Sequence, residues 1–160
     1  MIKVFSGLLL GLSLSLSVLA QAGEITVRDA WSRATAPGQD AAMVDFTISS
    51  PEVARLVGFE CGICRAAELH SMTHENGMMK MRQVDAIELP AGKAVNLGAS
   101  GYHLMLIGLK HPLQAGEQVT LTLKVRSADG QERKVTVNAE VRPINAAKSA
   151  HDEDGMHHHH

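Results

Sequence analysis

Hydrophobic and polar residues alternate along most of the chain beyond residue 24. Eight short segments have this period of two, at residues 25–31, 42–48, 53–59, 66–72, 78–84, 102–107, 119–125 and 133–141. Turn-forming residues separate the segments, and no long stretch has the 3.6-residue period of a helix. The pattern therefore predicts an all-β fold with a single domain, built as an antiparallel β-sandwich or barrel.

The first 22 residues have a different pattern, which is typical of an export signal. Lys3 precedes an uncharged apolar run, and Ala20-Gln21-Ala22 has the small-x-small pattern that signal peptidase recognises. The run is shorter than the about 20 residues that a membrane span needs. No cysteine follows it closely, which argues against a lipid anchor. We expect a signal peptide at residues 1–22, cleaved after Ala22, and a soluble protein in an oxidising periplasm.

Composition narrows the range of functions. A net charge of -2 leaves no basic surface that would indicate a nucleic acid or an anionic membrane as partner. No serine-histidine-acid set, phosphate loop or nucleotide fingerprint is evident, so the sequence gives no sign of an enzyme. Eight methionines and nine histidines stand beside one tryptophan and one tyrosine. These side chains are soft and borderline metal ligands, and their abundance indicates metal binding.

The segment around Asn76-Gly77 predicts a β-hairpin with a two-residue type I′ turn. With those two residues as the loop, the numbers of paired residues sum to 153, which places Met72 opposite Met81 and makes His70 a diagonal neighbour of Met81. A diagonal gap of roughly 7 Å leaves room for one ion between imidazole and thioether. Because side chains alternate, one face carries His70, Met72, His74, Met79, Met81 and Gln83.

A second His/Met pair, His103 and Met105, lies two residues apart on the segment 102–107, so both side chains face the same way. If this strand approaches the hairpin face, a site with two histidines and two methionines forms. Thioether and imidazole together favour Cu(I), whereas structural zinc sites do not use methionine. Methionines at alternate strand positions are also common core residues, and single histidines are usually structural. From the pattern alone the two interpretations have about equal weight.

The order and spacing of four residues resemble a known family. His70, ten residues, Met81, twenty-one residues, His103, one residue and Met105 match the motif of the periplasmic PCu(A)C copper chaperones. The family's optional methionine is present as Met72. The resemblance extends over residues 24–142 and includes the segments 27–38 and 101–110.

The resemblance implies both a fold and a function. The fold would be a cupredoxin-like β-sandwich at residues 23–144, binding Cu(I) through His70, Met81, His103 and Met105. The function would be delivery of copper to the CuA centre of cytochrome c oxidase, with oxidase subunit II and a Sco-type assembly protein as partners, and no enzymatic activity. Passive sequestration of copper is an alternative.

Cys61-Gly62-Ile63-Cys64 is not part of that motif. A thioredoxin-type site would need a βαβ context, which this chain does not have. A local disulfide between Cys61 and Cys64 is the first expectation in an exported protein. A second Cu(I) site or a thiol-disulfide oxidoreductase are the alternatives for the two thiols.

The chain ends in a small, polar and histidine-rich tail at residues 145–160, which we expect to be flexible. Clustered imidazoles and carboxylates suit Cu(II), so the tail is an auxiliary metal-binding candidate, unless it is a truncated purification tag. The carboxylates are those of Asp152, Glu153 and Asp154, and the terminal imidazoles are those of His157, His158, His159 and His160.

Overall fold

A computed structural model describes residues 23–145. The predicted signal peptide and the terminal histidines His157 to His160 lie outside the described residues. No helix in the described part is long and apolar enough to cross a membrane. Its regular structure consists of ten strands: β1 (Thr26–Arg33), β2 (Ala41–Ser49), β3 (Ala54–Cys61), β4 (Cys64–Glu75), β5 (Met78–Gln83), β6 (Ile87–Leu89), β7 (Ala94–Asn96), β8 (Tyr102–Leu109), β9 (Gln118–Ser127) and β10 (Glu132–Arg142).

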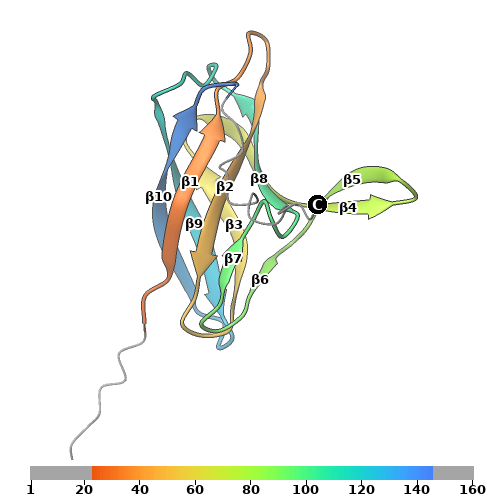
Figure 1. Cartoon of the computed structure of the whole chain (residues 1–160). Helices are drawn as coiled ribbons and strands as arrows, with labels where there is room; N and C mark the ends of the chain where they lie inside the picture. The colour runs from red at the N-terminus through yellow and green to blue at the C-terminus, as the bar shows by residue number, and fades with distance from the viewer. Residues whose placement is uncertain (1–22, 146–160) are drawn as a thin grey trace, which may run out of the picture.

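The strands form one continuous sheet that curls around the core. Their order is β5-β4-β8-β2-β1-β10-β9-β3-β6, and β7 pairs with β2. The curl brings β3 and β9 behind β1 and β2, which produces the two layers of a sandwich (Figure 1). The prediction of an all-β sandwich is confirmed. Among the pairs of strands in this sheet, β1 and β10 pair in parallel and the others are antiparallel.

All eight segments with alternating pattern are strands, and the structure adds two more. The added strands β6 and β7 have three residues each, which is too short for a period of two to be recognised. In β1 the register shifts between Arg28 and Trp31, and Asp29 has a φ of 55°. This β-bulge interrupts the alternation that the sequence pattern suggested.

Alternation along the strands separates an inner face from an outer face. The inner side chains are fully or almost fully buried, and burying each aliphatic or phenyl group contributes about 1.5–3 kcal/mol. The core includes Val44, Phe46, Ile48, Leu56, Leu69, Leu104, Leu106, Leu121, Leu123 and Val125. Leu69 and Leu104 thereby turn the neighbouring side chains of β4 and β8 to the outer face of the sheet.

Strands β4 and β5 form a hairpin that extends beyond the body of the sandwich (Figure 1). Its turn residues Asn76 and Gly77 have φ values of 53° and 77°, and both values are positive as a type I′ turn requires. The register pairs His70 with Gln83, Met72 with Met81 and His74 with Met79. The register predicted from the Asn-Gly turn is therefore confirmed.

Candidate metal centre

The two histidines of the spaced motif meet on the outer face of the sheet. His70 on β4 lies directly opposite His103 on β8 in the antiparallel register. Met105 is two residues further along β8 and therefore on the same face, where it lies opposite Glu68. Met81 is the diagonal neighbour of His70 across the hairpin. The sheet register thus brings all four predicted ligands to one patch of one face.

A carboxylate orients the His70 ring. The Nε2 atom of His70 lies 2.8 Å from the Oε2 atom of Glu68, which is two residues earlier on the same face of β4. An ionised carboxylate only accepts hydrogen bonds, so the neutral ring carries its proton on Nε2 and presents the lone pair of Nδ1. This arrangement is the one that histidines bound to metals commonly have, with a carboxylate as the outer partner.

The Nδ1 atoms of the two rings are buried and have no hydrogen-bond partner. Among residues 23–145, neither the Nδ1 atom of His70 nor that of His103 has a hydrogen-bond partner, and both atoms are inaccessible to solvent. The Nδ1 atom of His103 lies 3.9 Å from Oδ1 of Asp45, which is too long for a hydrogen bond. Buried polar atoms are almost always paired, so two orphan imidazole nitrogens on facing residues fit a bound cation.

The thioethers lie on the more accessible side of the patch. Met81 is 40% exposed. Met43 of β2 lies directly opposite Met105 of β8 and is 46% exposed. An open cavity of about 400 Å³ adjoins Met43 and Met105. Its wall includes Trp31, Met43, Asp45 and Met105. The patch therefore has buried nitrogen donors at its base and sulfur donors that solvent or a partner can reach.

The donor set favours a soft ion. Within the described residues, no three His, Cys, Asp or Glu side chains are arranged to hold a metal ion. An ion held between His70 and His103 by residues of this part of the chain would thus take its further ligands from thioethers. Two imidazoles with thioethers suit Cu(I), and they do not suit zinc, calcium or magnesium.

Sequence reasoning missed three residues of this patch. Glu68 was detectable, since it lies two residues before His70 on a predicted strand and alternation places both on one face. Asp45 and Met43 were not detectable, because their position beside His103 and Met105 depends on the pairing of β2 with β8. No local signal specifies which strand becomes the neighbour of β8.

The sequence matches a known protein family and a curated relative. A family model described as "Putative lipoprotein LpqE-like" matches residues 25–141. The chain belongs to the LpqE-like family. A curated relative, "Putative lipoprotein Lxx21020" of Leifsonia xyli subsp. xyli (strain CTCB07), is 34% identical over 118 residues, which are 73% of this chain and 70% of the relative.

Two solved structures similar to this LpqE-like protein are described as copper-bound. The Cu(I) form of DR1885 from Deinococcus radiodurans is 35% identical, with a TM-score of 0.59 over 77% of this chain and 81% of that one. A copper-bound PCuAC domain from PmoF2 has a TM-score of 0.60 at 24% identity, over 76% of this chain and 95% of that domain, and it supports the fold alone. The resemblance to PCu(A)C domains is confirmed at the level of the fold, and the ligand positions stay a prediction.

The two cysteines of the LpqE-like domain flank the tight turn between β3 and β4. Both are free thiols in the structure, with Cys64 buried and Cys61 partly exposed. The Sγ atom of Cys64 donates to the backbone carbonyl of Cys61 at 3.7 Å. The ends of a four-residue turn lie less than about 7 Å apart between Cα atoms, a separation that a disulfide can span. The disulfide between Cys61 and Cys64 therefore stays a prediction.

Burial makes Cys64 a poor nucleophile. Desolvation, followed by the hydrogen bond with the Cys61 side chain, raises the pKa of the Cys64 thiol to about 12. Only about one molecule in 10⁴ would carry a Cys64 thiolate at pH 8. This environment is opposite to that of thiol oxidoreductases, whose attacking cysteine has a lowered pKa.

We therefore predict different reactivities for the two thiols. In reduced, folded protein at pH 8, iodoacetamide should alkylate Cys61 and leave Cys64 unmodified, whereas in denaturant both should react. Peptide mass spectrometry measures the two sites separately. Rapid alkylation of Cys64 in the folded protein would contradict the prediction and restore the oxidoreductase hypothesis.

Proposed function

We propose that this LpqE-like protein is a Cu(I)-binding metallochaperone, with His70, Met81, His103 and Met105 as ligands. The observation that carries the proposal is the pair of buried Nδ1 atoms, both without a hydrogen-bond partner, on directly opposed histidines. The Cu(I)-loaded relative from Deinococcus radiodurans supports the choice of metal. No bond-making chemistry is part of this proposal, so the protein is not assigned an enzymatic activity.

The residues of the patch have separable tasks in binding. Glu68 holds the His70 ring in the tautomer that leaves Nδ1 free, and the sheet holds His103 opposite it. The four ligands are neutral, so the bound ion keeps a single positive charge, and Glu68 and Asp45 lie nearby to offset it. Thioethers carry no proton, so their affinity for the ion is less sensitive to acid than that of the histidines.

Transfer follows from the unequal exposure of the ligands. Met81 is 40% exposed, whereas His103 is only 8% exposed. A donor atom from a partner can replace the thioethers before the imidazoles, so the ion is handed over in steps without being released to water. The open cavity beside Met105 leaves space for such an approach.

The proposed place of action is the periplasm, after cleavage of residues 1–22. The matched family and the Leifsonia relative are described as lipoproteins, which supports export. The first cysteine of this sequence is Cys61, far beyond the apolar run, so the proposal is a released protein and not a lipid-anchored one. The proposed recipient is the CuA centre, on oxidase subunit II, in cooperation with a Sco-type protein.

Two alternatives have unequal support. The raised pKa of the Cys64 thiol disfavours a thiol-disulfide oxidoreductase. Passive sequestration is the second candidate, because the histidine-rich tail with His157 to His160 suits Cu(II) and would add binding capacity without a recipient.

Removal of two ligands should abolish tight binding. We expect His103→Ala with Met105→Ala to weaken Cu(I) affinity by more than about 100-fold, because loss of outer-shell partners alone costs 10–100-fold. Competition with a chromophoric Cu(I) chelator measures the affinity, and X-ray absorption shows whether nitrogen and thioether scattering are lost. Met78→Ala, on the other face of the hairpin, is the control. Unchanged affinity in the double variant would refute the ligand assignment.

Glu68 should matter although it does not bind the ion in this proposal. We expect Glu68→Ala to lower Cu(I) affinity about 10–100-fold, since His70 loses the partner that selects its tautomer. Chelator competition measures the loss, and the midpoint of urea unfolding shows whether the fold is intact. Glu88→Ala, which removes an exposed carboxylate on β6, is the matched control. Equal affinities for the Glu68 and Glu88 variants would show that the hydrogen bond is incidental.

Deletion of the gene separates delivery from sequestration. For a chaperone we expect loss of assembled CuA and of oxidase activity at low copper, because the recipient no longer receives its ion. Restoration by wild type, but not by the His103→Ala and Met105→Ala double variant, is the control. A strain that keeps oxidase activity and loses only tolerance to copper would favour sequestration.

A further inference from the structure

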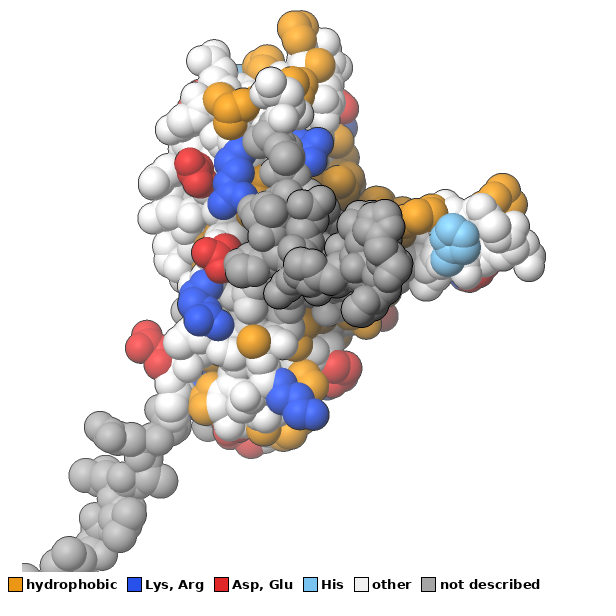
Figure 2. All heavy atoms as spheres, in the orientation of Figure 1, with side chains coloured by type: hydrophobic (Ala, Val, Ile, Leu, Met, Phe, Trp, Pro, Cys, Tyr) orange, Lys and Arg blue, Asp and Glu red, His pale blue; other side chains and the backbone are white. Residues whose placement is uncertain are grey.

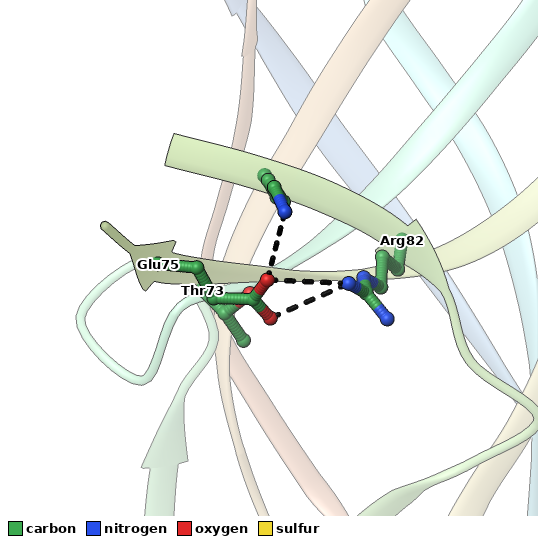
Figure 3. A network of polar contacts seen from close by, with 4 residues as sticks. Thr73, Glu75 and Arg82 are labelled. Carbon is green, nitrogen blue, oxygen red and sulfur yellow. Dashed lines mark hydrogen bonds and ion pairs between the residues drawn. The ribbon is translucent and has the colours of Figure 1, made fainter. Parts of the chain in front are cut away.

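The projecting hairpin has one charged face. Glu75 accepts hydrogen bonds from Nζ of Lys80 at 3.0 Å and from Nη2 of Arg82 at 3.3 Å. The Thr73 hydroxyl donates to the same carboxylate at 3.4 Å, and Figure 3 shows these groups gathered around it. The hydrogen bond from Lys80, followed by the charge of Arg82, lowers the pKa of Glu75. The carboxylate of this face is thus paired with the cations of Lys80 and Arg82.

The opposite face of the same hairpin carries soft donors. Alternation places Met72 and His74 of β4 there, and their partners Met81 and Met79 on β5 lie opposite them. Met78 belongs to the charged face, because it pairs with Glu75. Two successive cross-strand pairs of this face therefore consist only of thioethers and one imidazole.

The backbone pairing brings these side chains close together. The Val84 amide donates to the Leu69 carbonyl at 2.8 Å, so the odd-numbered residues of β4 are the hydrogen-bonded partners of β5. The Met72 amide donates away from β5, to Gly101 at 2.6 Å. Even-numbered residues thus form non-hydrogen-bonded pairs, whose Cα atoms lie about 4.5 Å apart and whose side chains are the closest across the ladder. His74 with Met79 is such a pair.

This end of the hairpin is open to solvent. Strand β8 pairs with β4 only as far as Ser71, opposite Tyr102, so no strand flanks β4 beyond that point in the described structure. Met79 is 63% exposed. A space-filling view shows a histidine on the projecting hairpin, with hydrophobic side chains near it (Figure 2). An ion in solution can reach this face without passing through the sandwich.

We propose that His74, Met79 and Met72 form a second, outer binding site for Cu(I). The inference rests on the proposed function, since it assumes that the protein handles this ion. One imidazole and two thioethers are the same soft donor types as in the centre at His70 and His103, and low coordination numbers suit a d10 ion. The outer site binds Cu(I) more weakly than the inner centre does, because it is exposed to solvent and lies near the ion that the inner centre holds.

The position of the outer site suggests its task. Met72 lies directly opposite Met81, a ligand of the inner centre, and both sites occupy one face of the hairpin. An ion can move between them by exchange of neutral ligands, with no change of oxidation state and no proton released. The outer site would thus be the place where copper enters or leaves, while the buried histidines retain it.

The test follows the methionine methyl groups by NMR in the full mature chain, labelled with ¹³C at the methionine methyl groups and kept anaerobic. Cu(I) is added as its acetonitrile complex. The first equivalent should shift Met81 and Met105, and further ion should shift Met79 and Met72 but leave Met78 unchanged. Met78 is the matched control because it is equally exposed, at 61%, on the opposite face of the same strand.

Variants give a second, independent measurement. His74→Ala with Met79→Ala should lose about one weakly bound equivalent and keep the tight one, whereas Met78→Ala should lose none. Equal shifts of Met78 and Met79, or an unchanged stoichiometry in the double variant, would overturn the outer site and leave the exposed methionines as an apolar docking surface. A first equivalent that does not shift Met81 and Met105 would instead refute the inner centre, so the two failures are distinguishable.

Discussion

The backbone pairing of β4 with its two neighbours is the constraint on which the rest of the site depends. Side chains alternate with a period of two, so a shift of one residue would turn His70 and Met72 into the core and Leu69 outward. On one side the left-handed turn at Asn76 and Gly77 sets the register with β5. On the other side the pairing of His70 with His103 sets the register with β8.

The nitrogen and sulfur donors of the candidate metal centre differ in burial and in charge, and we expect them to act differently. The two Nδ1 atoms are buried without a hydrogen-bond partner, which costs stability unless an ion occupies them. Glu68 binds the other nitrogen of the His70 ring and so leaves Nδ1 directed at the patch. The sulfur donors are neutral and partly exposed, so they can leave the ion without acquiring a proton or an unpaired charge. In the proposed function, retention and release thus come from different ligands of one site.

The same division continues along the hairpin. Its charged side chains pair with one another around Glu75 and remain on one face, which leaves the other face to methionines and His74. Single exposed apolar side chains are common on protein surfaces, but several exposed methionines on one face form a patch, and such patches mark interaction sites. In the proposed mechanism these methionines bind Cu(I) at the outer site and pass it to the centre at the base of the hairpin.

The sequence by itself determined the all-β class, the eight longer strands, the Asn-Gly turn and the faces of His70, Met81, His103 and Met105, because all of these follow from local alternation and local turn chemistry. Tertiary structure determines three other features of the fold. These are the short strands β6 and β7, the parallel pairing of β1 with β10, and the bulge at Asp29. The same is true of the positions of Asp45 and Met43 beside the two proposed ligands of β8. These features depend on which distant strands become neighbours, and that choice is made by burial of the whole inner face at once, which no local stretch of residues encodes.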